Sequence, residues 1–133
     1  MHRFQVRVYY EDTDFGGVVY YANYLKFLER GRTEALRDLG VDQVALKESG
    51  KVFVVRRASV EFLSPARFDD MLEVRTSTAW VKRASAGLSQ EIWRGADRLI
   101  EADVTIACMS VTGRPTGLPP EVRANLVQLG ERP

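Results

Sequence analysis

Cysteine and histidine are almost absent from this sequence, which has one of each, Cys108 and His2, among its 133 residues. A single cysteine cannot form an internal disulfide, so the chain is expected to work in a reducing compartment. One cysteine and one histidine also cannot build a Cys/His zinc site, and a nucleophile–histidine pair would have to use His2, beside the chain end. Any hydrolytic chemistry is therefore expected to use a carboxylate, backbone amides and water, with neither metal nor cofactor.

The sequence also lacks an excess of positive charge and a long apolar run. Nineteen Lys and Arg against 18 Asp and Glu give a formal net charge of +1, whereas a nucleic-acid-binding domain usually has a clear basic excess. The longest uncharged run, residues 15–25, is too short to span a bilayer, and Arg3 and Arg7 interrupt any leader-like segment. We therefore expect a cytoplasmic protein that binds no nucleic acid. Peripheral contact with a membrane stays open.

What the chain contains is sufficient for one globular domain. With 45% hydrophobic residues, a chain of this length buries roughly two-thirds of its unfolded surface. Neither a repeat nor a linker divides it, so residues 1–133 are predicted to form a single domain.

Alternating apolar and polar residues predict five strands, at residues 4–8, 52–63, 72–80, 88–92 and 100–108. The last four follow one another with short connections, which favours an antiparallel sheet. Short helices are predicted over residues 42–49 and from Pro120 onward.

A helical period predicts a long helix over residues 22–39. Its stripe on one face consists of Leu25, Leu28, Arg32, Ala35, Leu36 and Leu39. Asn23 is expected to be the N-cap, Gly40 to end the helix, and Gly31 to mark close packing of the helix on a sheet. The order of elements predicts an α+β fold in which the helix lies on one face of the sheet.

The most informative stretch is residues 9–24, YYEDTDFGGVVYYANY. Asp14 lies in a glycine-rich loop directly before the long helix, whose first turn has unpaired N–H groups and the positive end of the helix dipole. A carbonyl group placed there would be polarised, while the carboxylate attacks it or activates water. Gly16 and Gly17 let the backbone approach a substrate closely. Asp12 is expected only to support the turn.

This stretch resembles the signature of the hotdog-fold acyl-CoA thioesterases. The pattern is Asp-x-Asp, glycine, a short apolar run, and Asn-Tyr at the helix start. It is similar to the 4-hydroxybenzoyl-CoA thioesterase family and, through residues 24–30, to the Tol-Pal-associated branch of that family. The resemblance covers residues 3–112. It implies a hotdog fold, an acyl-CoA substrate, and a homodimer or homotetramer with active sites between subunits. The sheet agrees, because one helix leaves its edges and other face without a partner.

The resemblance assigns the catalytic carboxylate to Asp14, includes Gly17 in the catalytic loop, and gives Val18 and Tyr24 to substrate binding. One position departs from the pattern, since the Tol-Pal-associated branch usually has histidine where this chain has Tyr21. Tyrosine at this place is similar to the 4-hydroxybenzoyl-CoA enzyme, whose backbone N–H there contacts the thioester oxygen. A backbone donor survives a change of side chain, so Tyr21 is expected to act through its N–H.

A second candidate site follows Trp80 at a turn between two strands. Its adjacent cations, Lys82 and Arg83, are suited to the 3′-phosphate and pyrophosphate of coenzyme A. Arg56 and Arg57 could do the same work, but they lie within a strand and rank lower.

Several alternatives remain at the level of sequence. An acyl-CoA-binding module without turnover would gain nothing from a carboxylate in the loop, and a hotdog dehydratase normally needs an Asp–His pair, for which only His2 is available. In another branch of hotdog thioesterases the active carboxylate comes from the long helix, where Glu29 and Glu34 lie. The preferred acyl group, and the choice between nucleophile and general base for Asp14, stay open.

Overall fold

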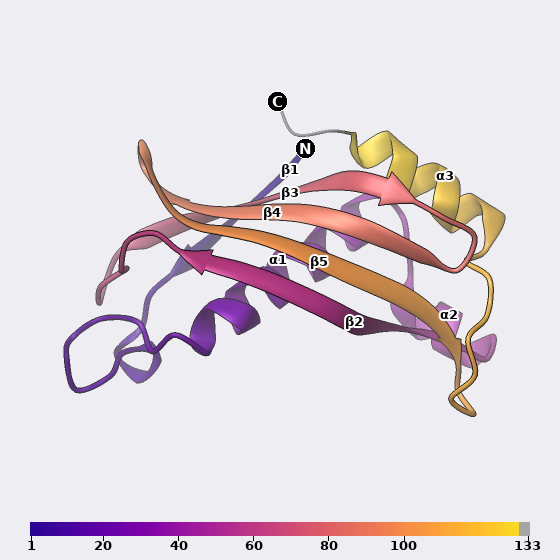
Figure 1. The fold of residues 1–133 in the computed structure, drawn as a ribbon, viewed down its shortest axis with the longest axis horizontal. Helices are drawn as coiled ribbons and strands as arrows, with labels where there is room; N and C mark the ends of the chain where they lie inside the picture. The colour runs from indigo at the N-terminus through magenta and orange to yellow at the C-terminus, as the bar shows by residue number, and fades with distance from the viewer. Residues whose placement is uncertain (131–133) are drawn as a thin grey trace.

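A computed structural model describes residues 1–130 and shows a curved five-stranded sheet with a long helix against one face (Figure 1). The elements are β1 (His2–Arg7), the short 3-10 helix η1 (Tyr10–Asp12), α1 (Asn23–Asp38), α2 (Gln43–Glu48), β2 (Lys51–Phe62), β3 (Met71–Val81), β4 (Ser85–Arg94), β5 (Asp97–Ser110) and α3 (Pro120–Leu129). The sheet order is β1-β3-β4-β5-β2, and all neighbours are antiparallel. The predicted α+β fold and its five strands are confirmed.

The start of α1 differs from the prediction that Asn23 caps the helix. Asn23 is the first helical residue, and no side chain caps the helix at the preceding Ala22. The N–H groups of residues 23–25 donate instead to the carbonyl groups of residues 20–22, at 2.8 to 3.3 Å. The N-cap prediction was wrong because a tight backbone turn already satisfies the donors that a cap would serve.

The buried face of α1 is rotated slightly from the predicted stripe. Leu28, Ala35 and Leu36 are buried as expected, but Leu25 is 47% exposed, and Tyr24 and Phe27 take its place in the core. Gly31 lies so close to β3 that an added Cβ would be 2.4 Å from Cγ1 of Val74. This confirms that the glycine marks close packing, since no side chain fits between the helix and the sheet.

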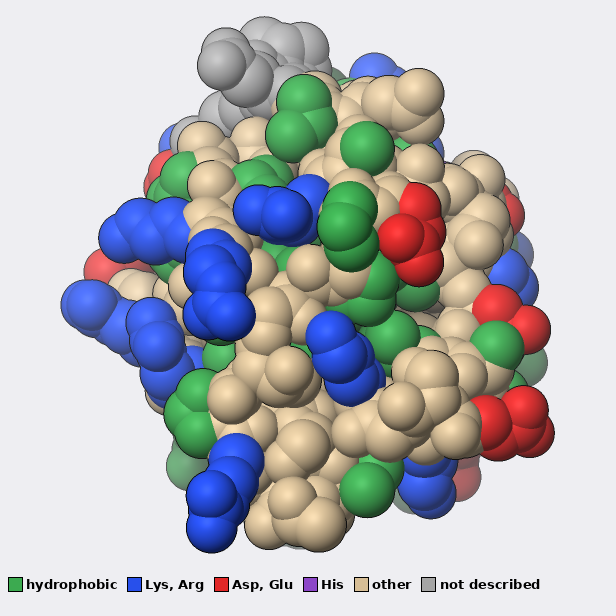
Figure 2. All heavy atoms as spheres, turned by 90° about the vertical axis from the view of Figure 1, so that its right-hand side faces the viewer, with side chains coloured by type: hydrophobic (Ala, Val, Ile, Leu, Met, Phe, Trp, Pro, Cys, Tyr) green, Lys and Arg blue, Asp and Glu red, His purple; other side chains and the backbone are tan. Residues whose placement is uncertain are grey.

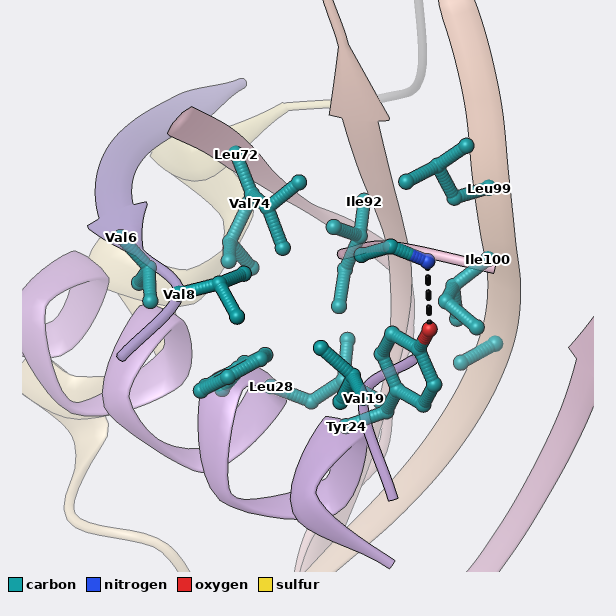
Figure 3. Packing of buried hydrophobic residues seen from close by; sticks show 13 residues of the cluster. Val6, Val8, Val19, Tyr24, Leu28, Leu72, Val74, Ile92, Leu99 and Ile100 are labelled. Carbon is teal, nitrogen blue, oxygen red and sulfur yellow. Dashed lines mark hydrogen bonds between the residues drawn. The ribbon is translucent and has the colours of Figure 1, made fainter. Parts of the chain in front are cut away.

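The core fills the space between α1 and the concave face of the sheet in two clusters. The first lies under the N-terminal half of the helix and is shown in Figure 3. It includes Val8, Leu28, Leu72, Ile92 and Ile100, each no more than 1% exposed. The second lies under the C-terminal half of α1 and beside α3. Burial of about 25 cal/mol per Å² of apolar surface makes these clusters the main stabilising contribution.

The two edges of the sheet differ in how far other elements cover them. Beyond the end of β1, α3 covers β3: Thr78 donates its N–H to the carbonyl of Gly130 at 2.8 Å and its hydroxyl to that of Leu126 at 2.7 Å. This helix begins at Pro120, as predicted. The opposite edge strand, β2, is mostly exposed, including Val55 at 51%. An uncovered strand of this length is a natural pairing surface.

The outer face of the sheet is polar. The guanidinium of Arg75 lies 4.3 Å from the ring centroid of Trp93, and Arg98 donates to Glu91 at 3.0 Å. Arg75 also donates to Glu73 at 2.6 Å. Exposed large apolar side chains lie instead on the β2 edge, including Val55 and Phe62, and in the loop before α1, including Tyr10 and Phe15. Within residues 1–130, no helix is long and apolar enough to cross a membrane.

Candidate active site

Asp12 holds together the loop between β1 and α1. Its carboxylate Oδ2 accepts the N–H of Tyr9 at 2.7 Å. Its carbonyl accepts two donors, the N–H of Tyr20 at 3.0 Å and the side-chain amide of Asn23 at 2.9 Å. These contacts give Asp12 the supporting role that the sequence predicts.

Asp14 lies at the exposed tip of the same loop. Its backbone closes a turn, donating to the carbonyl of Val18 at 2.9 Å and accepting from Gly17 at 3.0 Å. Gly17 has a φ of +79°, which a residue with a side chain rarely adopts. The carboxylate Oδ1 accepts the N–H of Gly16 at 2.9 Å, while Oδ2 has no partner within residues 1–130. One oxygen therefore fixes the orientation of the carboxylate, and the other is available for chemistry.

Unpaired backbone N–H groups lie just before α1, whereas the sequence predicts them in the first turn of the helix. The first helical N–H groups are paired, but those of Tyr21 and Ala22 donate to no group within residues 1–130. They lie at the positive end of the helix dipole, where a developing negative charge is stabilised. The first turn of the helix therefore lacks the unpaired donors that the sequence predicts, and that prediction was wrong.

An apolar pocket of about 250 Å³ adjoins the helix start. Its lining consists of Val19, Tyr21, Tyr24, Phe62, Leu63, Ser64 and Pro65. Phe62 contacts both tyrosines, with ring centroids 6.1 Å from Tyr21 and 5.8 Å from Tyr24. An aromatic pocket beside free N–H groups is suited to the acyl part of a thioester. Val18, predicted to bind substrate, does not line this pocket and instead pairs with Arg67.

Tyr24 is buried at the base of this pocket. Its hydroxyl accepts the N–H of Ala66 at 2.9 Å (Figure 3). Burial raises the pKa of the hydroxyl, with smaller contributions in the same direction from the charges of Asp70 and Asp14, although the Ala66 N–H and Arg94 oppose it. The hydroxyl is therefore neutral at physiological pH, and it holds the segment at Ala66 in place.

Asp14 itself faces a different hollow, open and about 560 Å³ in volume. Aromatic side chains border it, with Phe15 fully exposed, Phe68 at 56% and Tyr10 at 81%. The rings of Tyr10 and Phe68 meet edge to face, with centroids 6.3 Å apart. Exposed aromatic residues gathered around a carboxylate are typical of an interaction surface.

Lys82 and Arg83 lie far from Asp14 in the same chain. β1 pairs with β3 so that Met71 lies beside the loop, whereas the two cations follow the other end of β3 (Figure 1). The eleven residues of β3, with ten steps of about 3.3 Å between them, separate these ends by about 33 Å. One chain therefore does not bring the predicted catalytic carboxylate and the predicted phosphate-binding cations together.

The end of the molecule that holds Lys82 and Arg83 is rich in basic side chains (Figure 2). The Lys82 amine lies 4.9 Å from the ring centroid of Trp80, and that ring lies over Gly87, where a Cβ would be 2.1 Å from Nε1. Lys51 approaches the same end by donating to the carbonyl of Gly117 at 2.8 Å. The sequence analysis missed Lys51, because no local pattern connects it with the turn. It also missed the contact of Trp80 with Gly87, although a glycine within a strand often marks such a close approach.

Comparison with known proteins identifies the family. The model of the thioesterase superfamily matches residues 16–101. The chain belongs to the thioesterase superfamily. It is 43% identical to acyl-CoA thioester hydrolase YbgC of Escherichia coli O157:H7, across 96% of this chain and 97% of the relative. It is 44% identical to acyl-CoA thioesterase YbgC of Haemophilus influenzae, across 91% and 90%. A probable thioesterase from Bartonella henselae has a TM-score of 0.86 at 43% identity, across 89% and 98%. The chain is thus a thioester hydrolase with the hotdog fold.

The other polar candidates of this thioesterase are two glutamates of α1, which have local partners, and two arginines of β2. Glu29 accepts the hydroxyl of Thr33 at 3.0 Å, and Glu34 pairs with Arg37. Arg56 and Arg57 are exposed on β2, at an irregularity in its pairing with β5.

Two further kinds of reactive group are relevant here, a metal-binding cluster and a cysteine thiol. Within residues 1–130, no group of three His, Cys, Asp or Glu is placed to hold a metal ion. Cys108 is 1% exposed, and burial raises the pKa of its thiol, although Lys51 opposes this.

Proposed function

We propose that this thioesterase hydrolyses acyl-CoA to a carboxylic acid and free CoA, with Asp14 as the reacting carboxylate. The observation that carries the proposal is the state of that carboxylate: Gly16 holds Oδ1 at 2.9 Å, and Oδ2 has no partner within residues 1–130. The backbone N–H of Tyr21 is the proposed donor to the thioester oxygen. Gly17 gives the loop the backbone shape that this arrangement needs.

Two routes fit this geometry. As a nucleophile, Oδ2 attacks the thioester carbon, CoA leaves as the thiolate and takes a proton, and water then hydrolyses the mixed anhydride. As a general base, Asp14 takes a proton from water while the oxygen of that water attacks the carbon. The tetrahedral intermediate then expels the thiolate, which receives the proton. In both routes negative charge develops on the thioester oxygen, where the Tyr21 N–H stabilises it.

We further propose that two copies of the chain build each site. β2 is the uncovered edge, and Phe62 at its end contacts Tyr21 of the catalytic loop. A two-fold axis that pairs two β2 strands antiparallel places the loop end of one copy beside the basic end of the other. Lys82 and Arg83 would then bind the CoA phosphates of the neighbouring site. Two such dimers could associate as a homotetramer.

The acyl group enters the pocket between Tyr21, Tyr24 and Phe62 in this proposal. Half-buried Val18 supports the loop beside the pocket through its pairing with Arg67. The proposed location is the cytoplasm, as the single buried cysteine favours. The basic end of the molecule is the surface that would make any peripheral contact with an anionic membrane.

The test is release of thiol from a panel of short, long and aromatic acyl-CoAs, with Asp14→Asn beside the unchanged protein. Asparagine keeps the size and turn-forming ability of aspartate but cannot act as base or nucleophile. We expect kcat to fall by at least about 10²-fold while substrate binding is kept. Release at the unchanged rate by Asp14→Asn would contradict the mechanism. Binding without release from any substrate would favour a non-catalytic acyl-CoA-binding module.

A further inference from the structure

The side chain of Asn23 joins the start of α1 to the catalytic loop. Its amide Nδ2 donates to the carbonyl of Asp12 at 2.9 Å, across eleven residues of chain, and the bond is partly buried. The same carbonyl accepts the N–H of Tyr20 at 3.0 Å. Asn23 therefore does not cap its own helix but ties the helix to the loop that precedes it.

The two residues joined by this bond are close in sequence to the two groups that the proposed chemistry requires, the Asp14 carboxylate and the Tyr21 N–H. Asp14 follows the accepting residue Asp12 by two positions, and Tyr21 precedes the donating residue Asn23 by two positions. Within the loop, a second closure joins Asp14 to Val18 at 2.9 Å. The separation between the carboxylate and the Tyr21 N–H is therefore set from both sides, by the loop turn and by the Asn23 bond.

We propose that Asn23 is a positioning residue, which holds the Asp14 carboxylate at its working distance from the oxyanion donor. This inference rests on the proposed function of Asp14. Reacting groups must lie within a few tenths of an ångström of their productive geometry, and a displacement of 1 Å can cost about 10²-fold in rate. Asn23 touches no reacting atom in this scheme and acts through the loop.

The surroundings of Asn23 separate this role from support of the fold. Alanine has a higher helix propensity than asparagine, so Asn23→Ala keeps the first turn of α1. The helical N–H groups are already paired with the preceding backbone, and the buried face begins one residue later, at Tyr24. Loss of the side-chain amide therefore removes the tie and leaves the helix and core in place.

The experiment compares Asn23→Ala in two backgrounds, the unchanged enzyme and Asp14→Asn. In the unchanged enzyme we expect kcat to fall by about 10- to 100-fold, with KM and the affinity for a non-hydrolysable thioether analogue changed less than about twofold. In the Asp14→Asn background we expect less than about threefold further loss, because the group being positioned is already missing. Asn125→Ala, the same change on α3, is the matched control and should leave kcat unaltered.

Several results would overturn the inference. Equal losses of kcat in both backgrounds would mean that Asn23 acts independently of Asp14. A weaker affinity for the thioether analogue that accounts for the loss would make Asn23 a binding residue. If Asn23→Ala does not fold, Asn23→Gln, which keeps the amide but extends it by one methylene, replaces it in both backgrounds, with the same two outcomes. Undiminished kcat in Asp14→Asn alone would instead contradict the proposed function.

Discussion

Asp12 and Asp14 are two residues apart in one loop, yet their carboxylates have different surroundings. The Asp12 carboxylate and carbonyl are both occupied by backbone and amide donors. Asp14 has one carboxylate oxygen held and the other unpartnered within residues 1–130. The resemblance to the family gave Asp14 the reacting role and Asp12 the supporting one, and that assignment for Asp14 stays a prediction. The sequence could not predict the bond from Asn23, which depends on the path of the loop.

Tyr21→Phe tests whether Tyr21 acts through its backbone. The substitution removes the hydroxyl and keeps both the N–H and the ring that contacts Phe62. We expect kcat to change by less than about tenfold, or under about 1.4 kcal/mol of barrier. Any effect should be a changed preference among acyl groups, because the ring lines the apolar pocket.

The rival to this expectation is that the tyrosine hydroxyl replaces the histidine that the family resemblance implies at this position. Loss of a donor to the oxyanion costs about 10²- to 10³-fold in kcat. Steady-state rates at saturating substrate, measured for Tyr21→Phe and the unchanged enzyme, separate the two cases by more than a decade. A loss in the larger range would assign the role to the hydroxyl.

At the element scale, the sequence predicted the strands and the long helix well, because alternation and helical period are local signals. It placed the buried stripe of α1 wrongly at Leu25, since the buried side depends on where the sheet meets the helix. It also could not predict the separation of Asp14 from Lys82, because strand register sets that distance. Non-local geometry therefore limited the prediction of the site more than residue chemistry did.

The contact between α1 and β3 predicts the effect of Gly31→Ala. Alanine favours a helix over glycine by about 1 kcal/mol, but its Cβ would lie 2.4 Å from Cγ1 of fully buried Val74. Overpacking of a core costs about 1–3 kcal/mol, so we expect a net loss of about 1 kcal/mol in the free energy of unfolding. Denaturant titration measures it.

Val74→Ala supplies the control for this contact. It removes the methyl groups that meet the new Cβ, so the double variant should be more stable than the sum of the two single changes implies. An increase in stability for Gly31→Ala alone would show that the helix can move away from β3.

At the scale of the whole molecule, the two ends of the sheet carry different chemistry. Lys82→Ala with Arg83→Ala should raise KM for acyl-CoA, most strongly at low salt, where charge screening is weak. The effect should be much smaller for an acyl-pantetheine, which lacks the nucleotide phosphates. An equal rise in KM for both substrates would exclude the turn as the phosphate site.

Mixing two defective proteins tests whether each site draws on two chains. One carries Asp14→Asn, and the other carries both Lys82→Ala and Arg83→Ala. If a site combines the Asp14 of one chain with the cations of its partner, a mixed dimer has one site with both sets of residues intact and one with neither. Equimolar chains refolded together should then recover about a quarter of the unchanged kcat/KM, because half of the dimers are mixed. If both sets come from one chain, every site in the mixed dimer stays defective and nothing is recovered. The antiparallel pairing of β2 edges predicts recovery, because it places the loop end of one chain beside the basic end of the other.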